Sequence, residues 1–199
     1  MRPFGNFFAS FMILIIFGYL GSSGILGQTE ASAKESITYW SLLTEFKKGN
    51  YSYVANRSRQ EIIAQTCDAI DERFILIYIS SASDLKEMDS TLETCYSDKK
   101  VKNAIFYNAI YLVLERLIVA GNDSNAEKWG FRFRKDGTTS SRYAEGLYLY
   151  AIYFYQNQRW RDSLFVLQLA EQANPQQSLV SRIQKLKTTL TSKISGATP

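Results

Sequence analysis

The residues of this chain that could do chemistry are carboxylates and two cysteines, because the sequence contains no histidine. Without histidine, the chain lacks the commonest general base, metal ligand and side chain that titrates near neutral pH. It also has no phosphate-binding glycine loop, no G-x-S-x-G nucleophile turn and no H-E-x-x-H zinc helix. We therefore predict no catalytic residues, no metal site and no cofactor.

Carboxylates can still act in pairs, as in glycoside hydrolysis, because such groups meet only in the folded structure. Acidic residues that fall within segments of helical pattern are Glu61, Asp68, Asp71, Glu72, Glu115 and Glu145. The simpler interpretation of each is a solvated or ion-paired position at the surface. A small hydrolase is therefore the least favoured function.

The two cysteines, Cys67 and Cys95, are predicted to form a disulfide. The midpoint between them is Ser81, within the serine-rich run Ser80–Ser83, which is the best turn signal in that region. If the flanking helices fold back at this turn, both cysteines reach the open end of the same hairpin. A disulfide fits an exported protein, and the alternative is a pair of buried free thiols. C-x-x-C spacing is absent, which argues against redox or zinc chemistry.

Helices must position these residues. Apolar residues recur at three-to-four spacing, proline is scarce, and hairpin dipeptides such as Asn-Gly are missing. Breaks at regular intervals divide the chain into four helical pairs and a final helix. The predicted pairs are Glu35–Lys48 with Tyr51–Gln65, Ala69–Ser80 with Asp84–Tyr96, Lys100–Ala120 with Ser124–Arg134, and Ser141–Gln156 with Arg159–Ala173.

The final helix is predicted over Gln177–Ile194. Its apolar residues share one face, and its other side is charged, as expected of a helix that closes a stack and meets water. The residues of the apolar face are Leu179, Ile183, Leu186 and Leu190.

The segment Ala144–Pro175 carries a specific pattern of small and large residues. The first helix surrounds a small residue with large ones, and the second begins with an aromatic residue just past the turn. The positions are Leu147, Tyr150, Ala151, Phe154, Trp160, Ser163, Leu167 and Ala170, with Pro175 closing the unit. This pattern resembles a tetratricopeptide repeat over about 34 residues. Ser163 and Gln158 stand where the family has alanine and glycine.

The resemblance implies an all-α fold, a tetratricopeptide-like α-solenoid of about four antiparallel hairpins with a C-terminal capping helix. The earlier units match the pattern weakly, so an irregular helical bundle is the alternative. Aligning Tyr107 with Ala144, for example, requires an insertion near Asp136–Thr139. In proteins of this family, the first helices of successive units line a concave groove that binds a partner.

The predicted partner-binding residues lie just off the packing faces of these first helices. They are Asn108, Tyr111, Glu115, Glu145, Tyr148, Ile152 and Tyr155. Tyrosine suits a groove floor because it offers a flat apolar ring and a hydroxyl at small entropic cost. Glu115 or Glu145 is expected to orient the partner. The alternative for Tyr148 and Tyr155 is that they pack against the neighbouring helix.

A second candidate surface is the segment Trp129–Gly137, in which aromatic residues alternate with cations. Such a pattern could form a rim that binds a partner, an anionic lipid or a cell-wall polymer. The favoured alternative buries Trp129 and Phe133, four residues apart on one helix face, beneath the next unit. The arginines would then lie in solvent.

Residues 1–33 are predicted to be a secretory signal peptide or a membrane anchor. No charged residue lies between Arg2 and Glu30, and Phe11–Leu20 is an almost unbroken apolar run followed by Ala31-Ser32-Ala33. A retained anchor would give membrane association through residues 7–26. The remainder is predicted to be one domain at residues 34–195, with a short disordered tail at 196–199.

The net charge of +4 is mildly basic, and lysine and arginine are scattered along the chain. A nucleic-acid partner is therefore not expected, because such proteins usually cluster their cations. The sequence predicts an exported, non-catalytic scaffold that binds a protein or peptide partner in the bacterial cell envelope, in the periplasm or anchored to the inner membrane. The alternative is a structural subunit of an envelope or surface assembly.

Overall fold

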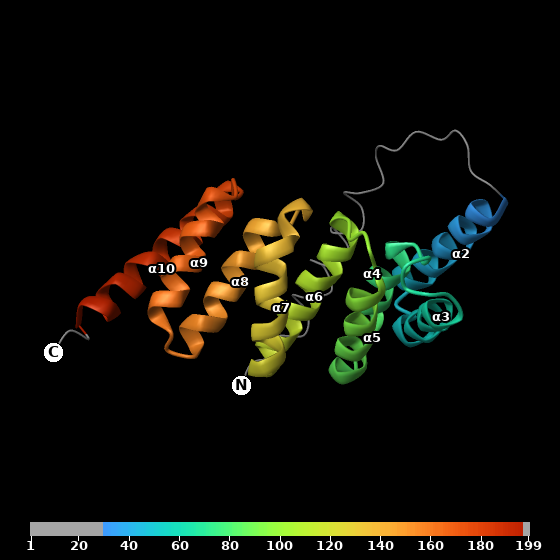
Figure 1. The fold of residues 1–199 in the computed structure, drawn as a ribbon, viewed down its shortest axis with the longest axis horizontal. Helices are drawn as coiled ribbons and strands as arrows, with labels where there is room; N and C mark the ends of the chain where they lie inside the picture. The colour runs from blue at the N-terminus through green and yellow to red at the C-terminus, as the bar shows by residue number, and fades with distance from the viewer. Residues whose placement is uncertain (1–29, 197–199) are drawn as a thin grey trace.

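The computed structural model describes residues 30–196, and every regular element in that range is helical (Figure 1). The helices are α2 (Glu30–Lys47), α3 (Tyr51–Ala64), α4 (Glu72–Ser81), α5 (Leu85–Asp98), α6 (Ala104–Ala120), α7 (Asp123–Asp136), α8 (Tyr143–Gln156), α9 (Trp160–Gln172) and α10 (Gln177–Gly196). A 3-10 turn, η1 (Gly137–Thr139), lies where the insertion was expected. The all-α prediction is confirmed, and each predicted helix has a counterpart.

The N-terminal prediction falls almost entirely outside these residues. The segment expected to be a signal peptide or anchor, residues 1–33, overlaps the described part only at the first turn of α2, and the last three residues of the chain are likewise outside it. Within residues 30–196, no helix combines the length and apolar character that crossing a bilayer requires.

Local sequence signals set where these helices begin and end. The side chain of Asn103 accepts a hydrogen bond from the Phe106 amide at the start of α6, and Asp84 accepts one from the Glu87 amide at the start of α5. Such caps satisfy backbone donors that have no partner within the helix. At the other end of α6, Gly121 adopts φ 68°, a left-handed conformation that glycine reaches without strain.

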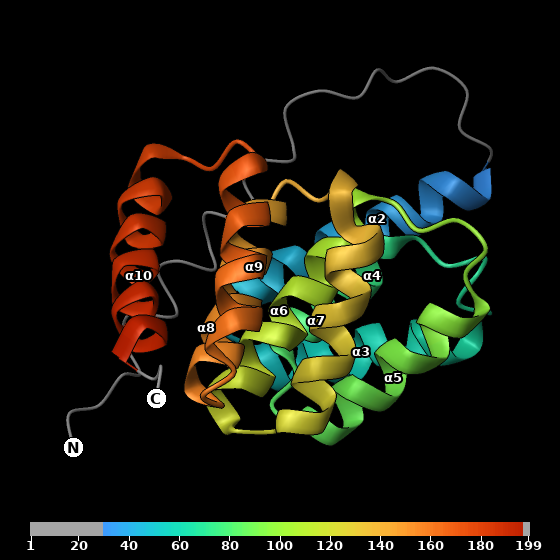
Figure 2. The same cartoon turned by 60° about the vertical axis from the view of Figure 1, so that its left-hand side comes forward.

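The helices follow one another along the long axis of the molecule (Figure 1). The pairs α2–α3, α6–α7 and α8–α9 are packed hairpins, as predicted. Even-numbered helices also pack on one another, α2 on α4, α4 on α6, α6 on α8 and α8 on α10, and form one row. Helices α5, α7 and α9 lie in a second row, in front of the first in Figure 2.

The second predicted pair differs from the expectation of a packed hairpin. Helix α4 packs mainly against α3 and α6, and its backbone makes few close approaches to α5. Cross-links hold the open end of the pair instead. At the open end, Cys67 and Cys95 lie at disulfide distance, with Cα atoms 4.9 Å apart, as the spacing predicted. Close by, the buried ammonium of Lys99 donates to the Ile70 carbonyl at 3.1 Å.

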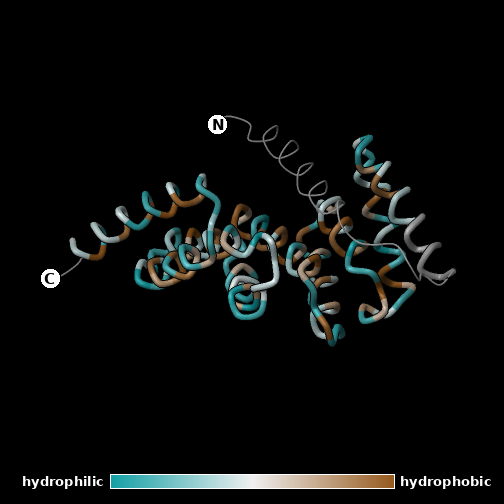
Figure 3. The backbone as a smooth tube through the Cα atoms, turned by 90° about the horizontal axis from the view of Figure 1, so that it is seen from above, coloured by the Kyte–Doolittle hydropathy of each residue, from teal (hydrophilic) through white to brown (hydrophobic). Residues whose placement is uncertain are grey.

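The segment with the tetratricopeptide pattern forms the hairpin α8–α9, whose matched apolar positions are buried apart from a half-buried Trp160. Ser163, where the family has alanine, is buried, and its hydroxyl donates to the Ala151 carbonyl at 2.7 Å. The hydroxyl therefore adds a hydrogen bond across the hairpin and leaves no unpaired donor. At the end of the row, hydrophobic and hydrophilic residues alternate along α10 (Figure 3), and Leu179, Ile183 and Leu190 are buried.

Candidate functional site

A cavity of about 680 Å³ opens where α2, α3 and α6 meet the turn between α4 and α5. Phe46 and Tyr51 supply an aromatic wall, and their rings pack edge to face with centroids 5.0 Å apart. The polar turn Ser80–Asp84 supplies another part of the lining. Glu115 and Arg116 of α6 also line the cavity. The space is therefore half aromatic and half polar.

Arg116 fixes the polar wall in place. Its guanidinium donates to the Ala82 carbonyl at 2.6 Å and to the Ser80 carbonyl at 3.1 Å. These carbonyls belong to the end of α4 and the turn after it, where helical partners run out. Burial lowers the pKa of Arg116, although the nearby Glu115 carboxylate opposes that shift. The donors of Arg116 are thus occupied by the turn.

Glu115 is the functional candidate of this cavity. Among the described residues, no hydrogen bond or ion pair to its carboxylate is formed, and the cations nearby act on it only through space. Burial raises its pKa, and the charges of Arg142 and Arg116 reduce this rise without cancelling it. A half-buried carboxylate without a partner is costly to keep charged. It gains most from a cation brought in by a ligand.

The other two carboxylates of the cavity already have partners. Asp84 caps α5 through the Glu87 amide, at 3.0 Å. Glu87 forms an ion pair with Arg59 of α3, at 2.9 Å. Both add negative potential near the opening, whereas Glu115 alone has its oxygens uncommitted within the part of the chain that the structure describes.

Of the seven predicted groove residues, Asn108 and Tyr111 are placed in the interior, with exposed fractions of 2% and 5%. The prediction that Tyr111 offers apolar contact to a partner is therefore wrong for this conformation. The reason is that η1 and α8 cover this part of α6. The amide oxygen of Asn108 accepts a hydrogen bond from Ser140 at 2.7 Å, and the guanidinium of Arg142 lies 5.4 Å from the Tyr111 ring centroid.

The predicted residues of α8 do not form one groove with Glu115. Tyr148 and Tyr155 are half-buried and pack against the core, as the alternative held. Arg182 of α10 lies over the Tyr148 ring, 4.7 Å from its centroid. Ile152 is also half-buried, and Glu145 lines a separate hollow of about 270 Å³ beside the α9–α10 connection. Only Glu115 of the predicted set reaches the larger cavity.

Sequence reasoning missed the turn Ser80–Asp84 and Arg116 as parts of the site. The serine run predicts a turn and does not by itself indicate a binding site. The available clue was the pair Glu115-Arg116 within the otherwise apolar helix α6, where two adjacent charges need neighbours with polar groups.

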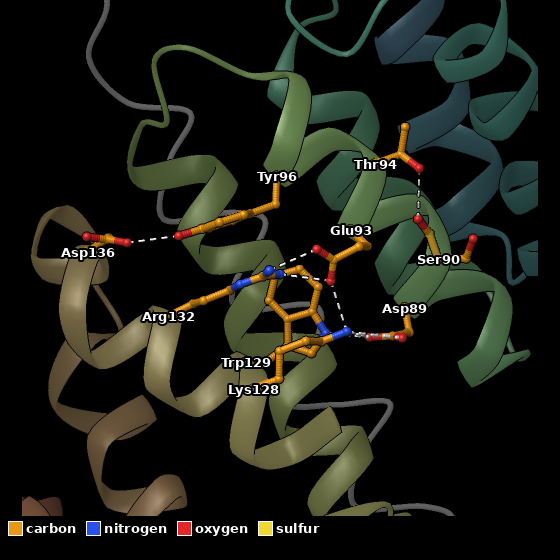
Figure 4. A network of polar contacts seen from close by, with 9 residues as sticks. All are labelled: Asp89, Ser90, Glu93, Thr94, Tyr96, Lys128, Trp129, Arg132 and Asp136. Carbon is orange, nitrogen blue, oxygen red and sulfur yellow. Dashed lines mark hydrogen bonds and ion pairs between the residues drawn. The ribbon is translucent and has the colours of Figure 1, made fainter. Parts of the chain in front are cut away.

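The second candidate surface, Trp129–Gly137, is divided between interior and exterior. Trp129 and Phe133 are buried, as the favoured interpretation predicted. The expectation that the arginines lie in solvent is wrong for Arg132. Its guanidinium donates to both oxygens of Glu93 on α5, each at 2.8 Å (Figure 4). That carboxylate also pairs with Lys128 at 2.9 Å.

Further contacts extend this network between α5 and α7. The indole of Trp129 donates to Asp89 at 2.5 Å, and the hydroxyl of Tyr96 donates to Asp136 at 2.9 Å (Figure 4). The hydrogen bond from Arg132 is the main cause that lowers the pKa of Glu93 to about 2. Desolvation, together with the charge of Asp136, raises the pKa of Tyr96 to about 12. These groups tie the second row of helices together and have few free donors or acceptors.

No protein-family model, curated protein or solved structure matches this chain. The tetratricopeptide likeness therefore rests on the residues of Ala144–Pro175 and on the hairpin that they form. Within the described residues, no group of three or more acidic or cysteine side chains is placed to hold a metal ion.

Proposed function

We propose that this protein is an exported, non-catalytic scaffold, a tetratricopeptide-like α-solenoid that binds a partner polypeptide through the cavity beside Glu115. The row of even-numbered helices supports the solenoid, because each helix of the row packs on the next. The observation that carries the binding function is the Glu115 carboxylate, which lines a cavity and has no partner among the described residues.

The chemistry of the cavity selects a basic side chain as the group that enters it. Glu115, Asp84 and Glu87 are three carboxylates around one opening, and the cation of the lining, Arg116, is engaged by backbone carbonyls. The aliphatic stem of a lysine or arginine fits against Phe46 and Tyr51, while its charged end meets Glu115. Backbone donors of an extended segment can pair with the serine hydroxyls of the turn.

An extracytoplasmic location is part of the proposal. The pairing of Cys67 with Cys95 is compatible with an oxidising compartment. The apolar N-terminal segment, residues 1–33, has the composition of a signal peptide or anchor. A periplasmic scaffold in the bacterial envelope combines both features.

Binding is favoured over catalysis because the carboxylates of the cavity do not form an uncommitted pair. A raised pKa suits a general acid, and Glu115 has one. Hydrolysis of a glycoside, however, needs a second carboxylate free to act as base or nucleophile. Asp84 is held as a helix cap and Glu87 is held by Arg59.

The test uses fluorescein-labelled twelve-residue peptides with a central lysine, and the same peptides with norleucine in its place. The lysine peptides should bind the full-length protein, and Glu115→Gln should weaken binding at least about 10-fold, the worth of one charge-assisted hydrogen bond. The same variant should raise the free energy of unfolding at neutral pH, because it removes a desolvated charge. Fluorescence anisotropy and urea denaturation measure the two effects.

The matched control is Asp98→Asn, which removes the same charge at an exposed position of α5. It should leave peptide binding unchanged. Affinity for lysine peptides should rise as pH increases above 4.5, because Glu115, whose pKa is raised, becomes charged there. Equal binding of lysine and norleucine peptides, or full binding by Glu115→Gln, would contradict the proposed role of the cavity.

A structural subunit of an envelope assembly is the second candidate. The observation that favours it is large apolar side chains in solvent, such as Tyr53 and Ile63 on α3 with exposed fractions of 57% and 68%. Light scattering after size-exclusion chromatography distinguishes the two functions. A monodisperse monomer at high concentration would count against the assembly subunit.

A further inference from the structure

A surface on the second row of helices is not used by the proposed function. Phe131 of α7 and Phe165 of α9 are exposed by 49% and 50%, so half of each ring is in water. The guanidinium of Arg134 lies 5.4 Å from the Phe131 centroid and 5.8 Å from the Phe165 centroid. The three side chains therefore form one continuous surface that crosses from α7 to α9. We call it the Phe–Arg–Phe surface.

Two further cations lie on the same helices as these rings. Lys135 lies four residues after Phe131 and Arg161 four residues before Phe165, so each shares a helix face with its ring. Both are exposed, and among the described residues no carboxylate lies within ion-pair distance of Lys135, Arg161 or Arg134.

The carboxylates close in sequence are committed elsewhere. Arg159 pairs with both Glu127, at 2.5 Å, and Asp162, at 2.8 Å. Asp136 accepts the hydrogen bond from Tyr96 at 2.9 Å. The Tyr96 hydroxyl is neutral, so it leaves the charge of Asp136 in place beside Lys135. Arg134, Lys135 and Arg161 together outweigh this one carboxylate, and the local charge of the Phe–Arg–Phe surface is positive.

We propose that the Phe–Arg–Phe surface docks an acidic segment of a partner polypeptide that also carries apolar side chains. Half-exposed aromatic rings with an arginine between them have the composition of interface hot spots. The charge complementarity selects glutamate or aspartate in the partner. A hollow of about 420 Å³ lies beside Phe131 and Lys135, where the rings of Tyr96 and Tyr150 face charged side chains of α7, and it offers room for one side chain of the partner.

A polypeptide fits this surface better than an anionic membrane. The surface offers three unpaired cations, each worth about 1 kcal/mol at a charged bilayer. The adjoining hollow, in contrast, is an open depression in the surface, lined by side chains of α5, α7 and α8. A flat bilayer does not fill such a hollow, whereas a side chain does. This surface has no residue in common with the cavity of Glu115 and carries the opposite charge.

The test measures anisotropy of a labelled twelve-residue peptide that alternates glutamate with leucine, added to the full-length protein. The wild type should bind it, and Arg134→Glu and Phe165→Ala should each weaken binding at least about 10-fold. Lys185→Glu, a charge reversal at an exposed position of α10, should bind as the wild type does. Circular dichroism confirms that each variant folds, which is expected because Phe165 is half exposed.

Two further probes separate the alternatives. A peptide that alternates glutamine with leucine should not bind, and vesicles of phosphatidylglycerol should not show a dependence on Arg134. Unchanged peptide binding by both Arg134→Glu and Phe165→Ala would overturn the proposal. Vesicle binding that depends on Arg134, without peptide binding, would overturn it in favour of a membrane. Glu115→Gln should leave binding of the acidic peptide unchanged, so the proposal for the Phe–Arg–Phe surface is tested independently of the proposal for the Glu115 cavity.

Discussion

At the residue scale, Glu115 carries a cost to folding, which the proposed binding of a cation would offset. Its burial raises its pKa, so the folded protein holds a proton more tightly than the unfolded chain does. The contribution of Glu115 to stability is therefore present at low pH and is lost as pH rises through its folded pKa. Functional sites commonly retain residues that lower stability, and the proposed role of Glu115 accounts for this one.

Two glycines show how closely α7 and α8 approach. A Cβ atom on Gly130 of α7 would lie 2.3 Å from the Tyr150 ring, and one on Gly146 of α8 would lie 2.2 Å from the Phe133 ring. Each glycine thus makes room for an aromatic side chain of the opposite helix. Both rings are also buried, so neither can move aside without disturbing the core.

Gly130→Ala should therefore lower the free energy of unfolding by about 1–3 kcal/mol, the usual effect of overpacking. This loss occurs although alanine favours the helix by about 1 kcal/mol relative to glycine. Urea denaturation measures the change. Gly196→Ala is the matched control, because nothing lies within 4 Å of the added atom. If both variants were equally stable, the close approach of Tyr150 to α7 would be disproved.

Single residues also show why the sequence predicted only part of the candidate site. Spacing predicted the pairing of Cys67 with Cys95, because a turn midway between them brings the two cysteines together. It also placed Glu115 off the packing face of its helix. Spacing misplaced Tyr111, because its exposure depends on how far η1 and α8 extend over α6. That coverage is a tertiary property, which a helical period does not contain.

At the element scale, α5 is held by side chains more than by backbone packing. It approaches α6 but comes little into contact with α4. The disulfide from Cys67 joins its last turn to the segment before α4, and Arg132 and Lys128 join it to α7. The two cysteines are 28 residues apart in sequence. A disulfide that closes such a loop contributes about 3–4 kcal/mol to the free energy of unfolding on the chain-entropy model. These ties replace the helix-to-helix packing that a regular hairpin would supply.

The ion pairs of Glu93 predict how the stability of this region depends on pH. Its folded pKa is about 2, below the ordinary value of 4.5, so the unfolded chain binds the proton more readily. The stabilisation is therefore complete above about pH 4.5 and is lost as pH falls towards about 2. Glu93→Gln should be less stable than the wild type at pH 6, and the difference should shrink below pH 4.5. Urea denaturation at a series of pH values measures both curves.

Other carboxylates titrate in the same range, so only the difference between the two proteins is informative. Glu45 and Glu171, for example, also have lowered pKa values, because lysines donate hydrogen bonds to them. A difference that stays constant from pH 6 to pH 2 would show that Arg132 and Lys128 do not stabilise the charged form of Glu93.

At the scale of the whole molecule, the sequence predicted the number and order of the helices better than their arrangement. Helix positions follow from apolar periodicity, caps and glycine turns, which are local. The loosely packed pair α4–α5 is held instead by long-range contacts, such as those of Lys99 with the Ile70 carbonyl 29 residues away and of Arg116 with the Ser80 carbonyl 36 residues away. Such long-range pairs leave no periodic signal. The tetratricopeptide pattern was legible in α8–α9 because that hairpin is the most closely packed.

The arrangement in a row makes a prediction about cooperativity, because the helices of residues 30–196 pack mainly on their near neighbours along the molecule. Ile183 of α10 is fully buried among apolar side chains. A charged side chain at this position would lose its hydration, which is costly. Ile183→Asp should therefore detach α10 and loosen α9, while α2 to α6 keep their contacts.

Hydrogen exchange read by mass spectrometry should show faster exchange in α9 and α10 and unchanged exchange in α2 to α6. Lys185→Glu on the exposed side of α10 should change neither end. Faster exchange throughout the chain would show a single cooperative core, and the row of separable units would then be the wrong description of this protein.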